Sequence, residues 1–450
     1  MTTPLLLRAQ NPYNRAMKSD SYVDFFRQTS PYIHNHRGKT FVIALDGDTV
    51  AHANFHRTIH DIALLQSLGI RIVIVHGARP QIDQRIAQAG EQSQFHNQLR
   101  ITDSSAMQPV KQALGSTRWQ IEAELSTGLP NSPMHGAQIK AIGGNFITAK
   151  PIGILDGVDY QYTGEIRGID TESIQQQFEM GCLVLLSPIG FSPTGEAFNL
   201  SYQEVAAKTA IAINAEKLIL VTEVSGILDN KNLVRSLSVP EAKGLLKSSK
   251  DTVQNKLLDT ACSACAQGVK RVHLVGCAED GALLTELFTR EGSGTLIMQD
   301  HSEVVRPAAI DDVGGIIDLI TPLEEQQILV KRSRELLETE ISRFTLVLHP
   351  EGDLLGCAAL YPTTDASLGE IACMATNPEF LNQGIASRLL EHLEADALKA
   401  GITRLFVLTT QTAHWFLEKG FVETQLSDLP KDKQSLYNYQ RNSRIFSKIL

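Results

Sequence analysis

A single glycine precedes a helical apolar pattern near the C-terminal end of the chain. The stretch LNQGIASRLLEHL (residues 381–393) places Leu389, Leu390 and Leu393 on one helical face, so the sequence predicts a helix that begins near Gly384. The first amide groups of such a helix are unpaired and lie at its positive dipole end, and glycine lets an anion approach the main chain. A phosphate-bearing ligand is therefore the first hypothesis. Plain turn chemistry is the alternative reading of this glycine.

Two other patterns raise the question of a metal. Cys262 and Cys265 form a CxxC, but no second pair of Cys or His residues lies nearby, and their setting SACAQG is typical of the end of a helix of small residues. His34 and His36 are interpreted as loop residues. The sequence therefore predicts no metal.

Length and composition restrict the classes of function. A chain of 450 residues with 43% hydrophobic residues predicts two or three well-filled domains. The formal charge is -9, and no dense Lys/Arg cluster offers a site for nucleic acid. No apolar run approaches the ~20 residues that span a bilayer, and the first residues lack the parts of a signal peptide, so no membrane association and a cytoplasmic protein are expected.

Buried-strand patterns alternate with helical patterns between residues 25 and 298, after a tail at 1–24 that is expected to be flexible. Continuous apolar strands between helices predict an α/β domain with a mainly parallel sheet covered on both faces. The strands are expected at 41–47, 71–77, 182–190, 217–224 and 270–276, and the helices at 21–38, 56–70, 80–90 and 204–215.

A polar segment ending in a proline predicts a linker at 299–303 and a second domain at 304–450. Its strands are expected at 304–308, 369–377 and 403–410, with a hairpin over 343–362, and its helices at 311–320, 326–341, from 384 onward, and 412–420.

The order of strand, glycine loop, helix, strand and a helix carrying Trp415 and Phe416 resembles the GNAT acetyltransferases over residues 303–450. In that family the loop binds the pyrophosphate of acetyl-CoA, although the leading Arg or Gln of its pattern is Leu381 here. The blocks LVKRSRE, GEIACMA, LFVLTT, HWFLEKGF and LYNYQRNS resemble more closely the bacterial N-acetylglutamate synthases. This resemblance implies acetyl-CoA-dependent acetylation of the α-amine of L-glutamate, the first step of arginine biosynthesis.

The resemblance places Glu370 at the general base, which takes a proton from the substrate ammonium. A solvated glutamate at the end of a strand is the alternative reading. Cys373 is expected to line the thioester site rather than to attack, because an amine can attack acetyl-CoA directly. Backbone amides near Cys373 would polarise the thioester oxygen. The residues implied to hold the coenzyme are Cys373, Met374, Ala375, Gln383, Gly384, Ile385, Ala386 and Ser387.

Forked guanidinium groups suit the two carboxylates of glutamate. The implied substrate-binding residues are Arg332, Arg441, Lys331 and Thr409. Arg334 is instead predicted to pair with Glu338, four residues on. Thr409 is equally well explained as an ordinary strand former.

Residues 25–298 resemble the amino acid kinase family, above all acetylglutamate kinase, which predicts a three-layer α/β/α fold. The phosphate-binding lysine of the kinases is Ala44 here, followed by Asp46, and two glycines of their second loop are Ala78 and Arg79. An alanine cannot neutralise phosphate and an aspartate repels it. The domain is therefore predicted to be a catalytically dead regulator.

The same resemblance implies an L-arginine site at His273, Glu286 and Gly292, with feedback inhibition, and a homo-oligomer built as a ring, possibly a hexamer. A carboxylate suits the guanidinium of the effector. An ordinary helix-surface glutamate and a strand histidine are the alternative. Two other functions stay open from the sequence: an amino acid kinase, and a non-catalytic arginine-sensing regulator.

Overall fold

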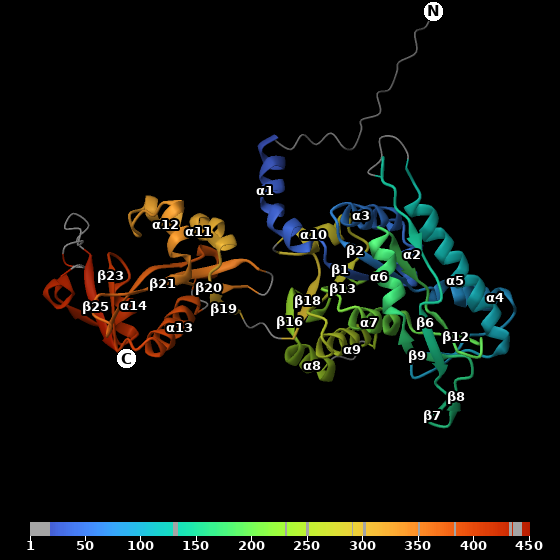
Figure 1. Cartoon of the computed structure of the whole chain (residues 1–450). Coiled ribbons are helices and arrows are strands. Elements are labelled where there is room, and N and C mark those ends of the chain that lie inside the picture. The colour runs from blue at the N-terminus through green and yellow to red at the C-terminus, as the bar shows by residue number, and fades with distance from the viewer. Residues whose placement is uncertain are drawn as a thin grey trace, which may run out of the picture. The chain divides into compact units, whose positions relative to one another are not determined.

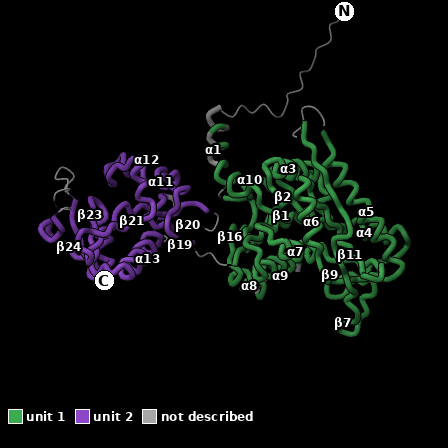
Figure 2. Tube along the Cα trace, in the orientation of Figure 1, with its two compact units in different colours: residues 1–300 green, residues 301–450 purple. Residues whose placement is uncertain are grey.

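The computed structural model describes residues 19–128, 134–229, 232–248, 252–289, 291–299, 303–349, 352–381, 384–431, 434 and 443–450. The chain divides into two compact units, residues 1–300 (unit 1) and 301–450 (unit 2), coloured separately in Figure 2. Among the described residues, no helix is both long enough and apolar enough to cross a membrane.

Unit 1 is built on an eight-stranded sheet with the order β16-β18-β17-β13-β1-β2-β10-β5. The strands from β17 to β5 run parallel, whereas β18 is antiparallel to β17. The strands are β1 (Thr40–Leu45), β2 (Arg71–His76), β5 (Ala141–Ile142), β10 (Leu183–Leu186), β13 (Lys217–Thr222), β16 (Ser236–Ser238), β17 (Arg271–Gly276) and β18 (Thr295–Met298).

Side-chain alternation along these strands fills one core on each face of the sheet. Val42 and Ala44 of β1 pack with residues of α6 to α9, whereas Phe41, Ile43 and Leu45 pack with residues of α3, α5 and α10. Figure 1 shows α3 and α10 on one side of this sheet and α7, α8 and α9 on the other, and the two cores confirm the predicted three-layer α/β/α fold. The helices are α1 (Ser19–His36), α2 (Gly47–Ala51), α3 (Phe55–Ser67), α4 (Arg79–Gln88), α5 (Ser104–Leu125), α6 (Thr171–Glu179), α7 (Tyr202–Ala212), α8 (Val239–Ser248), α9 (Thr252–Ala266) and α10 (Ala282–Phe288).

A second sheet and three short hairpins complete unit 1. The sheet has the order β12-β11-β6-β9, and the hairpins are β3-β4, β7-β8 and β14-β15. Their strands are β3 (Gln94–His96), β4 (Leu99–Ile101), β6 (Ile147–Pro151), β7 (Ile154–Leu155), β8 (Val158–Asp159), β9 (Gly164–Ile169), β11 (Ile189–Phe191), β12 (Ala197–Asn199), β14 (Leu228–Asp229) and β15 (Asn232–Leu233).

Two expectations for unit 1 were wrong in detail. The strand expected over 182–190 is two strands, because β10 belongs to the large sheet and β11 to the smaller one. His34 and His36 are not loop residues but form the last turn of α1. His36 is buried there, where its Nε2 bonds the carbonyl of Leu287, and burial together with the charge of Lys217 lowers its pKa to about 4.

Unit 2 is a seven-stranded sheet with the order β19-β20-β21-β22-β23-β25-β24, in which β22 and β23 are parallel. Helices α11 and α12 pack on one face and α13 and α14 on the other. The elements are β19 (Val304–Pro307), α11 (Val313–Glu325), α12 (Arg334–Glu340), β20 (Phe344–Leu348), β21 (Leu354–Pro362), β22 (Leu368–Thr376), α13 (Ile385–Lys399), β23 (Arg404–Thr409), α14 (Ala413–Glu418), β24 (Val422–Thr424) and β25 (Arg444–Ile449).

The helix expected over 326–341 was wrong in its first half. Helix α11 continues to Glu325, and Gln327 then adopts a positive φ of 59° that ends helical geometry. A new helix, α12, begins only at Arg334, where the side chain of Ser333 accepts the amide of Leu336 as an N-cap. Lys331 and Arg332 therefore lie on a connecting segment rather than on a helix.

Candidate active site

Strand β22 is broken at its centre by a bulge at Cys373. The pairing with β21 joins Ala372 to Ala359 and Ala375 to Cys357, so the register shifts between them, and Cys373 has a φ of 52°. A non-glycine residue in this region costs on the order of 1–3 kcal/mol, which the surrounding sheet must offset. The bulge changes the direction of the main-chain N–H and C=O groups midway along β22.

The bulge coincides with the point where β22 and β23 separate. Their parallel ladder joins Leu368–Ile371 to Arg404–Val407 and stops, although β22 continues to Thr376. No ladder hydrogen bond joins the described residues 372–376 to β23. Main-chain groups on this edge can therefore bond a ligand, as the expectation for Cys373, Met374 and Ala375 requires.

Helix α13 confirms the predicted helix start. Its N-cap, Gly384, has a φ of 81°, and no side chain caps the helix. A Cβ built at Gly384 meets no atom within 4 Å, so the space before the helix is open. The first turn consists of Ile385, Ala386 and Ser387, of which Ile385 is buried while the other two are half-buried. The free amides and the positive dipole end of a 15-residue helix are suited to bind an anion.

Glu370 lies on the same strand, before the bulge. It is half-buried and stands opposite Tyr361 of β21 and Phe406 of β23. The Tyr361 hydroxyl donates to Glu340 Oε2 at 2.7 Å, and burial together with that bond raises the pKa of Tyr361. Glu370 therefore lies in the part of β22 that pairs with β23, just before the part that does not.

Arg332 reaches this region from the segment before α12. Its amide donates to Glu324 Oε1 at 2.9 Å, and its Nη1 donates to the carbonyl of Val330 at 3.1 Å. Burial by itself lowers the pKa of Arg332, but the neighbouring Cys373 and Tyr361 raise it above its ordinary value. The structure thus brings Arg332 to the bulge and to the strand opposite Glu370.

The other residues predicted to bind substrate are placed less favourably. Lys331 is exposed. The hydroxyl of Thr409 bonds the Thr412 hydroxyl at 2.8 Å and accepts the Thr412 amide at 3.0 Å, so it is engaged in the turn before α14. Arg334 forms the predicted ion pair with Glu338 at 2.8 Å. Arg441 and Gln383 lie outside the described residues.

Two buried thiols meet at the bulge. Cys357 Sγ donates to the carbonyl of Cys373 at 3.7 Å. The thiol contact with Cys357 lowers the pKa of Cys373, burial opposes this, and the charge of Arg332 lowers the pKa further. The same contact and burial raise the pKa of Cys357. Sequence reasoning missed Cys357 and the Tyr361–Glu340 pair, because only the strand register brings them to the site.

The residues predicted to bind arginine form a hydrogen-bonded cluster in unit 1. His273 Nδ1 lies 2.7 Å from Glu286 Oε1, and the amides of Ser293 and Gly294 both donate to Glu286 Oε2 at 2.8 Å. Burial raises the pKa of Glu286, but these bonds outweigh burial and lower it.

Two basic side chains lie next to this cluster. Lys217 is buried, and its Nζ lies 3.1 Å from His273 Nε2. Arg235 Nη1 donates to the carbonyl of Gly292 at 3.2 Å. A Cβ at Gly292 would lie 2.5 Å from Glu286 Oε2, so glycine is required for this approach. Sequence reasoning missed Lys217, whose strand pattern gives no sign of a buried charge.

The loops of unit 1 that correspond to the phosphate-binding loops of the resembling kinases carry Asp46 and Arg79. Asp46 caps α2 by accepting the Thr49 amide, and burial raises its pKa to about 6. Among the described residues no group of three His, Cys, Asp or Glu side chains is arranged to hold a metal ion.

Comparisons with known proteins agree with both units. Residues 39–276 match the Amino acid kinase family, and residues 316–421 match the Acetyltransferase (GNAT) family. An amino-acid acetyltransferase of Pseudomonas syringae pv. syringae is 52% identical over 430 residues, which cover 95% of this chain and 99% of the relative.

The crystal structure of N-acetylglutamate synthase from Neisseria gonorrhoeae complexed with coenzyme A and L-arginine matches with a TM-score of 0.82 and 38% identity. The structure of that enzyme with coenzyme A and N-acetyl-glutamate matches with a TM-score of 0.60 and 39% identity. Each match covers 96% of this chain and 100% of the other. By this identity over nearly its whole length, the chain belongs to the amino-acid acetyltransferase family, with an amino acid kinase-like unit followed by a GNAT unit.

Proposed function

We propose that this chain transfers the acetyl group of acetyl-CoA to the α-amine of L-glutamate. The observation that carries the proposal is that unit 2 combines an uncapped helix start, a strand edge without a partner strand, and Glu370 on that same strand, which Arg332 approaches at Cys373. The coenzyme A and N-acetyl-glutamate complexes of the Neisseria enzyme support the same pair of substrates.

In the proposed reaction, the amides at the start of α13 bind the diphosphate of acetyl-CoA, and the free edge of β22 bonds the arm that carries the thioester. Arg332 binds a carboxylate of glutamate. Glu370 takes a proton from the ammonium group, directly or through one water.

The amine nitrogen then bonds to the thioester carbon while amides at the bulge stabilise the oxyanion. The carbon–sulfur bond breaks with its electron pair leaving on sulfur. No covalent intermediate on Cys373 is required, so its proposed role is to line the site.

Thiol release from acetyl-CoA, measured across L-glutamate, L-aspartate, L-glutamine and glycine, tests this function. We expect L-glutamate to be the preferred acceptor by a wide margin, because glutamine and glycine lack the second carboxylate and aspartate holds it one methylene closer to the amine. Equal rates for all four acceptors, or no release with glutamate, would contradict the proposal. ADP formation from ATP with N-acetyl-L-glutamate tests the kinase alternative, and we expect none above background.

A Gly384→Ala variant is expected to raise the KM for acetyl-CoA by about tenfold, because a methyl group at the helix start obstructs the diphosphate. Gly401→Ala is the matched control. Gly401 follows the same helix, has the same φ of 81°, and has equally open space around a built Cβ. Both variants should lose a similar ~1 kcal/mol of stability from backbone strain. If both raise the KM equally, the anion site is not at Gly384.

We further propose that unit 1 is a catalytically dead regulatory unit that senses L-arginine at His273, Glu286 and Gly292. The arginine complex of the Neisseria enzyme supports an arginine site in this family. Glu286 supplies a carboxylate for the guanidinium, provided that the present bonds to Ser293 and Gly294 rearrange or are shared.

Glu286→Gln should abolish or strongly weaken inhibition by arginine while leaving uninhibited turnover within about twofold, because the substitution removes charge but retains shape. Glu279→Gln, an exposed residue shortly before α10, serves as the control and should keep wild-type inhibition. Inhibition curves at several arginine concentrations provide the measurement. Unchanged inhibition in Glu286→Gln would remove this site from consideration.

The remaining parts of the proposal concern assembly and location. A ring-shaped homo-oligomer built through unit 1 is proposed, with a hexamer as the expected form. Light scattering coupled to size-exclusion chromatography should then give six times the chain mass of 49.4 kDa. A cytoplasmic location is proposed because acetyl-CoA and glutamate are cytoplasmic metabolites.

A further inference from the structure

Unit 1 contains a cavity of about 240 Å³ that neither acetyl transfer nor arginine sensing uses. The starts of α2, α4 and α7 line it, together with the hairpin β3-β4 and α9. Its volume is below the ~300–1,000 Å³ of sites for drug-sized ligands, so it suits a small metabolite rather than a nucleotide.

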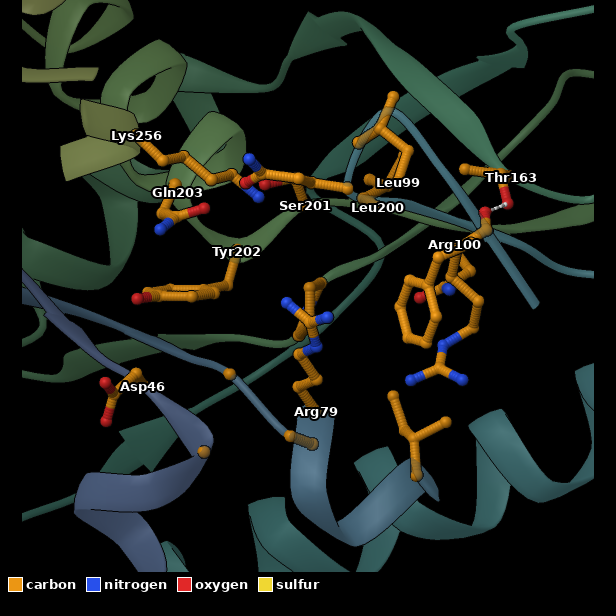
Figure 3. A pocket seen from close by; sticks show the side chains of 18 of the residues that line it. Asp46, Arg79, Leu99, Arg100, Thr163, Leu200, Ser201, Tyr202, Gln203 and Lys256 are labelled. Carbon is orange, nitrogen blue, oxygen red and sulfur yellow. Dashed lines mark hydrogen bonds between the residues drawn. The ribbon is translucent and has the colours of Figure 1, made fainter. Parts of the chain in front are cut away.

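Arg79 is the residue that distinguishes this cavity. It stands where the resembling kinases have a loop glycine, and it rises from the start of α4 into the cavity between Tyr202 and Arg100 (Figure 3). Its guanidinium carbon lies 4.6 Å from the centroid of the Phe95 ring. This stacking orients a planar cation without neutralising it.

Lys256 of α9 supplies a second cation. It is half-buried, and burial together with the charge of Arg79 lowers its pKa. Within the described part of the chain, no carboxylate lies within ion-pair distance of Arg79 or Lys256. Arg100 differs, because it is buried and pairs with Asp83 at 2.7 Å. Two cations that repel each other in a cavity, with no protein anion between them, create a site for an external anion.

Helix ends add to this positive potential. The N-caps of α4 and α7 are Ala78 and Ser201, neither of which makes a side-chain capping bond, and both line the cavity. The opposing charges are Asp46 and Asp48 at the start of α2. Figure 3 shows Asp46 across the Tyr202 ring from Lys256.

The balance of charges selects among anions. The two aspartates disfavour phosphate, which carries up to two negative charges on one group, more than a carboxylate group, which carries one. The remaining walls include Ile82, Leu99, Leu200 and Val253, which suit a short aliphatic chain. From these contacts we infer that the cavity of unit 1 is a binding site for the carboxylate group of a small aliphatic metabolite, held between Arg79 and Lys256. The inference does not depend on acetyl transfer.

Isothermal titration of the full chain with glutarate at low ionic strength tests the inference, with inorganic phosphate and ATP titrated separately. Glutarate should bind, and Arg79→Gln and Lys256→Gln should each weaken binding at least about tenfold, because a charge-assisted hydrogen bond is lost. The matched controls are Arg85→Gln, on the same helix, and Lys111→Gln, an exposed residue of α5. Both controls should bind as the wild type does, and thermal melting should show that all variants fold.

An Arg332→Gln chain separates this cavity from the proposed glutamate site in unit 2. Glutarate binding that persists in Arg332→Gln and is lost in the two cavity variants supports the inference, whatever the outcome for acetyl transfer. Absence of glutarate binding, or binding unchanged by both cavity variants, overturns it. Tighter binding of phosphate or ATP than of glutarate overturns the assignment to carboxylates.

Discussion

Glu370→Gln is expected to lower kcat for acetylation of L-glutamate by at least about 100-fold while changing the KM for acetyl-CoA little. Glutamine has the shape of glutamate but cannot accept a proton, and a positioned base contributes about 10²–10⁴-fold to rate. Initial rates of thiol release at saturating substrates measure the effect. At high pH, more of the unbound glutamate already carries a neutral amine. The difference in kcat between the variant and the wild type should therefore shrink.

The control is Glu391→Gln, which changes an exposed glutamate on α13 in the same unit. It should retain full activity, because Glu391 is exposed on the surface of α13. A Glu370→Gln enzyme with wild-type turnover across the pH range would show that another group removes the proton.

Arg332→Gln is expected to raise the KM for L-glutamate by about 10- to 100-fold, with little change in the KM for acetyl-CoA. A guanidinium–carboxylate contact contributes about 1.5–3 kcal/mol, which corresponds to this range of affinity. Arg334→Gln, two residues away, is the matched control. Because Arg334 pairs on the surface with Glu338, its loss should cost less than ~1 kcal/mol of stability and leave both KM values unchanged.

Equal effects of Arg332→Gln and Arg334→Gln would refute a specific substrate contact. A rise in the KM of both substrates in Arg332→Gln would indicate instead that Arg332 supports the bulge, since it also neighbours Cys373.

Local sequence patterns predicted most of the elements that carry the proposed site. The apolar pattern of strands and the 3.6-residue spacing of Leu389 and Leu393 depend on neighbours along the chain, so strands β1, β2, β13 and β17 of unit 1 and helix α13 were predicted correctly. The helix expected over 326–341 was wrong in its first half. The prediction gave more weight to helical apolar spacing than to Ser333, which is the N-cap of α12.

Features that depend on distant strands were not predictable. The positive φ of Cys373 arises from a mismatch between β22 and β21, and cysteine carries no signal for it. Tyr361 lies opposite Glu370 only because of the register of those strands. Arg79 and Lys256 line the same cavity although they are far apart in the sequence, so no local pattern could predict that they are neighbours. Strands β24 and β25 were also missed.

The early end of the ladder between β22 and β23 has a consequence for solvent access to the main chain. Amide protons of residues 372–376 that face β23 lack a strand partner there and should exchange with deuterium faster than those of Leu368–Ile371 in the same strand. Bound coenzyme would supply acceptors for these amides and slow their exchange. The exchange rate of amides at this gap in the sheet is thus expected to show whether the coenzyme is bound.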